Sequence, residues 1–289
     1  MSATTDRPTF DLLDPYLYQD AERMHAAFTR MRANEPVYRD HRNGLWGITR
    51  HGDLKEVEAL VTELLDQVVA SGRMEVVDSL SGQLPARLTC RLIGYPESMW
   101  REVKSAQVDG QPLPPRAMVH EVGLFISGGG ETTRTAIGHG LRAFVDHPEQ
   151  WEAMAADPSL VPDAVEEVLR WVTPLNNMFR RAAADDRIGG QPVGRGDRII
   201  MLYPSANRDE AVFDDPFTFD IRRSPNPQIS FGYGTHLCVG THVARTTLAA
   251  VFGQLSQRIT DLRAGGEPDV EPNSFARAVR SFQLGFSAR

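Results

Sequence analysis

Apolar residues recur at helical spacing near the start of the chain. Met24, Phe28 and Met31 fall on one face and predict a first helix. Two short strands are predicted after it, at residues 36–38 and 45–49. An Asn-Gly pair lies between them, which is typical of a tight hairpin turn.

Helical spacing dominates the rest of the chain. A helix begins at residues 51–58, the pattern resumes at Ala59, and Gly72 is expected to end it. Further helices are predicted at residues 84–93, 116–146, 162–172 and 241–259, and strand-like pieces at 179, 187–188, 199–202, 276–279 and 282–286. Residues 207–227 show no period and predict an irregular loop.

Three consecutive glycines, Gly128, Gly129 and Gly130, interrupt the longest helical pattern. Each glycine within a helix lowers its stability by about 1 kcal/mol relative to alanine. The segment could therefore be a linker between two helices. Apolar helical spacing continues on both sides, which favours one long helix.

Composition excludes several classes of protein. The 289 residues are 41% hydrophobic, enough for one large core or two modest domains. A formal net charge of −7 argues against a nucleic-acid-binding surface. The first residues do not resemble a signal peptide, and no run of about 20 apolar residues predicts a membrane span.

The chain has two cysteines, Cys90 and Cys238. Two thiols make no disulfide framework, which fits a reducing cytoplasm. Cys90 lies among apolar residues of a predicted helix and is expected to be a small core residue. Cys238 calls for a separate explanation.

Cys238 lies in the string FGYGTHLCVG at residues 231–240, which we call the cysteine loop. The loop directly precedes a predicted helix. A thiolate there would meet the free amides and the positive dipole end of the first helical turn. Both are expected to lower the pKa of the thiol, so that the sulfur can bind a metal as an anion.

The other residues of the cysteine loop suit a flat cofactor. Gly232, Gly234 and Gly240 let the backbone approach closely and adopt conformations that a side chain forbids. Phe231 can pack near the sulfur and shield it from water. The loop therefore predicts a cofactor site with Cys238 as its metal ligand.

Two alternatives stand beside this interpretation. His236, Cys238 and His242 could indicate zinc, but a structural zinc site usually has four protein ligands and no fourth candidate is spaced nearby. A buried, inert cysteine is the other alternative, and the flanking glycines argue against it.

The cysteine loop matches the pattern F-x-x-G-x-x-x-C-x-G at every fixed position and so resembles the haem signature of the cytochrome P450 family. Three further motifs follow the order of that family. They are GGGETT at residues 128–133, the pair Glu167 and Arg170 of an E-x-x-R motif, and FDIRR at residues 219–223. One such motif is common by chance, whereas four in order are not.

The resemblance implies a mainly α fold over residues 1–289, a single P450-like haem domain. A long central helix would cross the haem, with small β-sheets at one side. The implied cofactor is haem b, with Cys238 as the axial ligand of the iron. A thiolate ligand pushes electron density to the iron, which favours oxygen activation.

The resemblance also assigns roles to residues outside the cysteine loop. Glu131 and Thr132 match an acid–alcohol pair that relays protons, which needs a titratable group and a positioned hydroxyl. Glu167, Arg170 and Arg223 resemble a buried salt-bridge network that fixes the region around the loop. Alone, Glu167 and Arg170 would read as a surface pair worth about 0.3–0.5 kcal/mol.

Two residues match positions that contact the haem propionates. Arg180, in the sequence FRRAAAD, matches an arginine of the family. Gln228 falls where many members have a histidine. A glutamine amide can donate a hydrogen bond but brings no charge.

The resemblance is interrupted by two gaps, between residues 58 and 59 and near residues 104–107. Several helices of the substrate-pocket side are missing there. A haem with an open distal side would be wet, and exposed apolar surface would favour aggregation or a covering partner. We therefore expect weakened haem binding and impaired hydroxylation.

The implied reaction is monooxygenation, in which one oxygen atom of O₂ enters a C–H bond of a small lipophilic substrate. Electrons would come from NAD(P)H through a ferredoxin and a ferredoxin reductase. The string PLNNMFRRAAAD at residues 174–185 resembles actinobacterial members that act on sterols and other lipids. Three classes stay open: an active monooxygenase, a haem-binding but catalytically silent protein, and a structural or interaction protein without haem.

Overall fold

The computed structural model describes residue 10 and residues 21–34, 37–40, 45–48, 51–84, 107–108, 111–112 and 115–289. Several sequence predictions fall outside these ranges. They are the Asn-Gly turn, Cys90 with all but the first residue of its helix, and residues 104–106 of the second gap.

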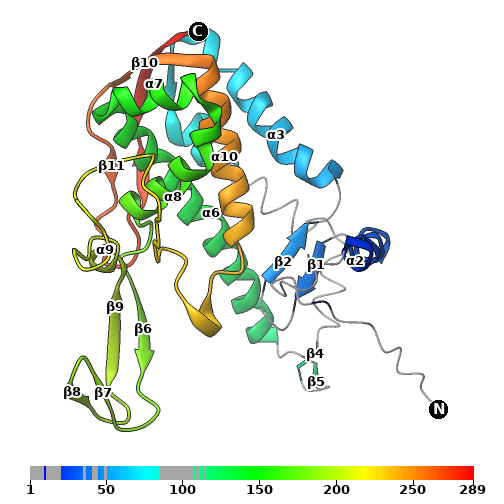
Figure 1. The fold of residues 1–289 in the computed structure, drawn as a ribbon, viewed down its shortest axis with the longest axis vertical. Helices are drawn as coiled ribbons and strands as arrows, with labels where there is room; N and C mark the ends of the chain where they lie inside the picture. The colour runs from blue at the N-terminus through cyan, green and yellow to red at the C-terminus, as the bar shows by residue number, and fades with distance from the viewer. Residues whose placement is uncertain are drawn as a thin grey trace.

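Helices make up most of the described chain (Figure 1). The α-helices are α2 (Ala21–Asn34), α3 (His51–Asp66), α6 (Pro115–Asp146), α7 (Pro148–Ala156), α8 (Val161–Val172), α9 (Tyr203–Ala206) and α10 (Thr241–Arg258). Short 3₁₀ turns lie at Val69–Ser71, Pro158–Leu160 and Gly234–His236, and a π-helical turn lies at Val77–Ser81. The predicted long helix at residues 116–146 is confirmed as α6. It is unbroken at the three glycines, so the linker alternative is wrong.

Helix α3 runs without interruption through the first predicted gap, between residues 58 and 59. It packs on α10 and is hydrogen-bonded to it through residues on both sides of the junction between residues 58 and 59. Thr62 Oγ1 donates to Gln254 Oε1 at 2.9 Å, and Gln254 Nε2 donates to the Glu58 carbonyl at 3.0 Å. The helix ends at Asp66, and a 3₁₀ turn leads to Gly72, whose φ of +67° terminates it.

Strands form small antiparallel sheets at the margins of the helices (Figure 1). The three-stranded sheet has the order β10 (Ile259–Ala264), β13 (Gln283–Ala288), β3 (Arg73–Glu75). The pairs are β1 (Val37–Asp40) with β2 (Leu45–Ile48), β4 (Gln107–Val108) with β5 (Gln111–Pro112), β6 (Asn177–Arg181) with β9 (Arg198–Leu202), β7 (Asp186–Ile188) with β8 (Gln191–Val193), and β11 (Asp269–Val270) with β12 (Val279–Ser281). The arm formed by β6 to β9 projects away from the helices.

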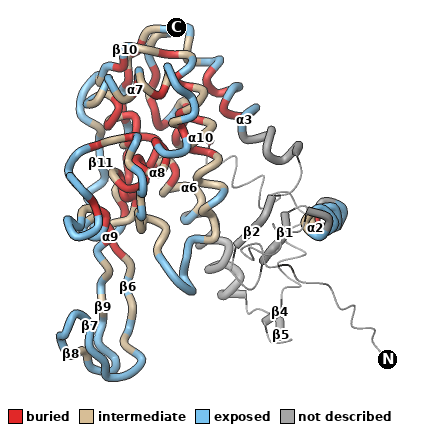
Figure 2. Tube along the Cα trace, in the orientation of Figure 1, coloured by how far each residue is buried: buried red, intermediate tan, exposed pale blue. Residues whose placement is uncertain are grey.

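The core lies where α6, α7, α8 and α10 meet, as the buried positions in Figure 2 show. Phe144 of α6 is its aromatic centre. Its ring centroid lies 5.1 Å from Trp151, 5.4 Å from Phe219 and 5.6 Å from Phe252, all in edge-to-face arrangements. Such pairs contribute about 0.5–1.5 kcal/mol each beyond the area they bury. Phe219 therefore anchors the irregular segment at residues 207–227 to the helical core.

No helix among the described residues is long and apolar enough to cross a membrane. The mainly α fold with small sheets agrees with the prediction. The two strands predicted near the end are shifted: they occupy Val279–Ser281 and Gln283–Ala288.

Gly140 of α6 lies against α8 and α10. A methyl group there would lie 2.8 Å from Cζ of Phe252 and 2.9 Å from Cγ1 of Val168, both in the core. Gly140→Ala is therefore expected to lower the free energy of unfolding by about 1–3 kcal/mol through overpacking. Urea denaturation followed by circular dichroism measures the change. Gly253→Ala on α10 is the control, because its methyl group would lie 3.7 Å from Val161 and only the helix propensity, about 1 kcal/mol in favour of alanine, should act. A Gly140→Ala variant as stable as the parent would contradict this account of the packing.

Candidate functional site

The cysteine loop is a series of tight turns in front of α10. The Gly232 amide donates to the Ile229 carbonyl, and the Cys238 amide donates to the Phe231 carbonyl, both at 2.9 Å. Gly232 and Gly234 have φ values of +74° and +71°. This left-handed region favours glycine, so the turn requires both residues.

Gly240 plays a different part from the other two glycines. Its φ is −85°, which other residues adopt without strain. A Cβ atom there would lie 3.7 Å from Sγ of Cys238, an ordinary contact. The prediction that Gly240 needs special backbone freedom is therefore wrong.

The side chain of Cys238 is exposed. Even so, desolvation by the surrounding protein raises the pKa of the Cys238 thiol above its ordinary value. The Gly240 amide, the Thr241 hydroxyl and the charge of Arg245 act against this in that order, and they do not outweigh it. The predicted lowering of the pKa is therefore wrong for the protein alone, because the helix-terminus argument left out desolvation.

The cysteine loop also carries exposed apolar side chains. Tyr233 is 86% exposed and Leu237 is 40% exposed. Beside them a Cβ atom at Gly234 would meet nothing within 4 Å. Phe231 packs partly into the core, with the Arg245 guanidinium 4.9 Å from its ring centroid. A soft sulfur ligand on an open, largely apolar loop fits a flat apolar cofactor such as haem.

Arg245 links the start of α10 to α8. Its Nη2 donates to Oε2 of Glu166 at 2.8 Å, and Gln228 Nε2 donates to the same oxygen at 3.0 Å. Burial alone would raise the pKa of Glu166, but the bonds from Arg245 and Gln228 hold it below its ordinary value. Oε1 of Gln228 accepts from the Ser230 amide at 2.7 Å. Nε2 of Gln228 has a second N–H group, so the contact with a propionate stays a prediction.

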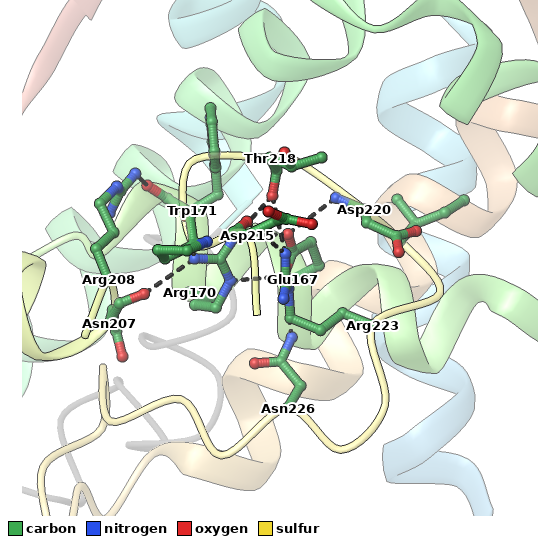
Figure 3. Close-up of polar contacts among 12 residues, drawn as sticks. Glu167, Arg170, Trp171, Asn207, Arg208, Asp215, Thr218, Asp220, Arg223 and Asn226 are labelled. Carbon is green, nitrogen blue, oxygen red and sulfur yellow. Dashed lines mark hydrogen bonds and ion pairs between the residues drawn. The ribbon is translucent and has the colours of Figure 1, made fainter. Parts of the chain in front are cut away.

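Behind the loop, Glu167 and Arg170 of α8 form an ion pair with no solvent exposure (Figure 3). Arg170 donates through Nε to Oε2 at 2.8 Å and through Nη2 to Oε1 at 2.7 Å. Its remaining N–H groups reach the carbonyls of Asn207, Pro216 and Thr218. All five N–H groups of the guanidinium are thus satisfied.

Glu167 also binds the segment that leads to the cysteine loop (Figure 3). Its carboxylate accepts from Arg223 Nε at 3.2 Å, from Asn226 Nδ2 at 3.1 Å and from the Asp220 amide at 2.9 Å. Arg223 donates further to the carbonyls of residues 214, 215 and 218. The structure thus brings Glu167, Arg170 and Arg223 together, and we call these three residues and their partners the Glu167 network.

Asn207 connects the Glu167 network to the cysteine loop. Its Oδ1 accepts from the Ile229 amide at 2.8 Å, and its Nδ2 donates to Ser230 Oγ at 2.8 Å and to Thr173 Oγ1 at 2.9 Å. Ser230 Oγ in turn donates to the Leu169 carbonyl at 2.7 Å. The sequence analysis missed Asn207 and Ser230, because both lie in stretches without a period and their bonds join distant residues.

Glu131 and Thr132 lie together on α6. The carboxylate of Glu131 pairs with Arg134 and accepts from Thr135 Oγ1 at 3.3 Å. The hydroxyl of Thr132 donates to the Gly128 carbonyl at 2.9 Å. Beside Gly128 a Cβ atom would meet nothing within 4 Å. The helix therefore has open space at Gly128, one turn before Glu131 and Thr132.

Arg180 is half-buried on β6. One of its N–H groups donates to the carbonyl of Phe179 at 2.9 Å, which leaves most of the guanidinium donors for another acceptor. Phe179 beside it is 59% exposed. The zinc alternative finds no support, because no cluster of three or more His, Cys, Asp or Glu side chains that could hold a metal occurs in the part of the chain that the structure describes.

Comparison with known proteins identifies one matching family and several related proteins. The profile of the family described as Cytochrome P450 matches residues 50–284. A steroid C26-monooxygenase of Mycobacterium tuberculosis is 38% identical over 63% of this chain and 50% of its own length. One of Mycolicibacterium smegmatis is 32% identical over 83% of this chain and 57% of its own length. The chain thus spans about half the length of the curated relatives it matches.

Solved structures share the fold. A cytochrome P450 of Chondromyces apiculatus matches with a TM-score of 0.71 at 22% identity, over 95% of this chain and 97% of that chain. A P450 in complex with an acyl carrier protein ligated to hexadec-9Z-enoic acid matches with a TM-score of 0.72 at 27% identity, over 88% of this chain and 80% of that chain.

Removal of the Glu167 carboxylate should destabilise the protein strongly. Glu167→Gln leaves Arg170 charged and buried without its counter-ion, which is expected to lower the free energy of unfolding by roughly 3–5 kcal/mol. Urea denaturation measures the loss. The matched control is Glu271→Gln, whose partner Arg280 lies 3.8 Å away in an exposed pair. It should change stability by less than about 1 kcal/mol. Equal effects of the two substitutions would contradict the structural role of Glu167.

The charge of Arg245 should affect the ionisation of Cys238 in the protein without cofactor. Arg245→Gln removes a positive charge that lowers the pKa of Cys238, so the pKa should rise further and less thiolate should be present at neutral pH. The rate of iodoacetamide alkylation against pH, in a Cys90→Ser background, measures the shift. Arg263→Gln, at an exposed position of β10, should leave the profile unchanged. An unchanged profile for Arg245→Gln would contradict the prediction.

Proposed function

Because the chain belongs to the cytochrome P450 family, we propose that it is a haem-thiolate monooxygenase with Cys238 as the ligand of the haem iron. The observation that carries the proposal is the exposed thiol of Cys238, presented by a loop that the Glu167 network and Asn207 hold in place. Haem b, when bound, supplies the iron at which O₂ is reduced with electrons from NAD(P)H, delivered by a ferredoxin and its reductase.

Cys238 must lose its proton to bind the iron. The raised pKa of the thiol means that the protein alone holds the protonated form, so haem binding releases a proton. The Gly240 amide, the Thr241 hydroxyl and Arg245 then stabilise the thiolate. Arg180 supplies the free donors for a propionate. Gln228 is already hydrogen-bonded to Glu166 and Ser230, so it contributes less than Arg180 to binding the propionates.

Glu131 and Thr132 form the proton path of the proposed reaction. Thr132 presents its hydroxyl at the open stretch of α6, and Glu131 is the titratable group beside it. Because Arg134 holds the Glu131 carboxylate, the side chain must leave that ion pair to carry a proton. The ion pair between Glu131 and Arg134 is therefore the state of the proton path before a proton is transferred.

The substrate that we propose is a small lipophilic molecule of the steroid or lipid class. The support is the similarity to steroid C26-monooxygenases together with the exposed apolar side chains on β6 and β9. Phe179 lies opposite Ile200 in the strand register and both are exposed, so the two form one apolar face. Such a face suits an apolar substrate, whereas Arg180, the next residue of β6, points to the opposite face of the strand pair.

A haem-binding but catalytically silent protein is the second candidate. It is favoured by α3, which passes through the first predicted gap as one helix docked on α10 and leaves no chain there to line a pocket. With part of the pocket missing, water would reach the haem and reduced oxygen would be lost as peroxide. We propose that turnover is impaired for this reason.

The absorption difference spectrum of the reduced protein with carbon monoxide tests the proposal. The parent and a Cys90→Ser variant should both show the band of a thiolate-ligated haem, and Cys238→Ser should lose it. An identical spectrum after Cys238→Ser would sink the assignment of the ligand. Product analysis with a steroid substrate, together with peroxide release per NADPH consumed, then separates an active enzyme from a silent one.

A further inference from the structure

A cavity of about 250 Å³ lies away from the cysteine loop, where the ends of α6 and α8 meet the segment before β12. Its polar lining consists of His139, Arg142, Asp146, Arg208 and Arg277, and Trp171 forms one wall. No residue of the cysteine loop and neither Glu131 nor Thr132 lines it. The proposed monooxygenase chemistry therefore does not account for it. A water molecule occupies roughly 30 Å³ of liquid volume, so the cavity has room for a small hydrated ion.

Positive charge exceeds negative charge in this cavity. Arg142 pairs with Asp146 at 2.8 Å and with Glu267 at 2.9 Å, so its charge is fully compensated and these three residues together carry one negative charge. Neither Arg208 nor Arg277 has a carboxylate within ion-pair distance in the described part of the chain. The surplus charge of the cavity lies on these two arginines.

His139 does not change this balance. Burial and the nearby charge of Arg277 lower the pKa of His139 to about 4, so its ring is neutral at physiological pH. Desolvation, and after it the charges of Arg170 and Arg277, also lowers the pKa of Arg208. Two cations thus line the same cavity, and among the described residues no carboxylate lies within ion-pair distance of either.

The two arginines keep most of their hydrogen-bonding capacity. Arg208 Nη2 donates to the Trp171 carbonyl at 2.8 Å and Arg277 Nη1 donates to the Val172 carbonyl at 2.6 Å (for Arg208 see Figure 3). These bonds cap the end of α8 and explain part of why cations lie there. Each guanidinium has five N–H groups, and in the fully buried Arg170 all of them are bonded. Among the described residues, the half-buried Arg208 and Arg277 make one side-chain bond each, so their other N–H groups can bind a ligand in the cavity.

We propose that this cavity binds a small oxyanion, a carboxylate or a phosphate group, between the guanidinium groups of Arg208 and Arg277. The planar fork of arginine matches both kinds of group through paired N–H bonds. The Trp171 ring, with the Arg208 guanidinium 5.0 Å from its centroid, holds that guanidinium in place. Arg208 follows Asn207, which binds the segment before the cysteine loop, so a bound anion would also steady that part of the fold.

Titration of the intact protein tests the proposal directly. Thermal denaturation and calorimetry are followed with sodium phosphate and with sodium acetate, at an ionic strength kept constant with sodium chloride. We expect saturable binding and a rise in Tm for at least one of the two oxyanions beyond the effect of chloride. Binding of phosphate alone or acetate alone identifies the class. No saturable effect of either would overturn the proposal.

Variants locate the binding. Arg277→Gln and Arg208→Gln should each weaken the bound oxyanion about tenfold or more, because a charge-assisted hydrogen bond is lost. Arg195→Gln, an exposed arginine in the loop before β9, is the control and should bind as the parent does. Equal affinity in the parent and in Arg277→Gln would overturn the proposal.

A measurement without substitutions covers the case that these variants fold poorly. Phenylglyoxal modifies accessible arginines, and mass spectrometry reports the extent at each position. Saturating oxyanion should protect Arg208 and Arg277 of the parent protein and leave Arg195 unprotected. Equal modification of Arg208 and Arg277 with and without the oxyanion would contradict the site.

Discussion

The carboxylate of Glu167 lies in the protein interior with charged and polar donors from several chain segments around it. An ion pair removed from water is stable only when its remaining hydrogen-bonding groups are also satisfied. Here they are satisfied by backbone groups of an irregular stretch that has no helix or sheet to hold it. The pair thus fixes the path of residues 207–226, and this path in turn places the cysteine loop in front of α10. The position of the Cys238 thiol therefore depends on two sets of contacts: those that hold residues 207–226 to the ion pair, and those that hold the cysteine loop to residues 207–226.

The cysteine loop and the Glu167 network make different contributions to the site. The network supplies a rigid support because the buried side chains of Glu167 and Arg170 have all their hydrogen-bonding groups engaged, whereas the cysteine loop leaves its sulfur and the apolar side chains of Tyr233 and Leu237 exposed. A protein that must accept a large flat cofactor needs both properties in adjacent segments. The surrounding protein desolvates the sulfur, so the thiol favours its protonated form until a metal competes for it.

Much of this could be predicted from the sequence where the signal is local. The helical spacing at residues 116–146 gave the full extent of α6, and the spacing of Glu167 and Arg170 placed both on one turn of a helix. Non-local features could not be predicted. The sheet that joins β3 to β13 pairs residues from opposite ends of the chain, and Asn207 reaches Thr173 and Ile229 only once the chain has folded. The predicted direction of the Cys238 pKa shift is wrong for the same reason, because desolvation depends on packing by residues that are distant in the sequence.

The unbroken course of α3 constrains the proposed junction between residues 58 and 59. Each residue added to or removed from a helix rotates everything beyond it by roughly 100° about the axis. The side chain of Thr62 and the carbonyl of Glu58 both meet Gln254, and Leu60, Leu64 and Leu65 all face the core. The Glu58 carbonyl, directly before the junction, therefore lies on the side of α3 that faces α10, as Thr62 does after it. One residue more or fewer at the junction would turn either this carbonyl away from Gln254 or the three leucines away from the core, so the junction tolerates only lengths that preserve this angular alignment.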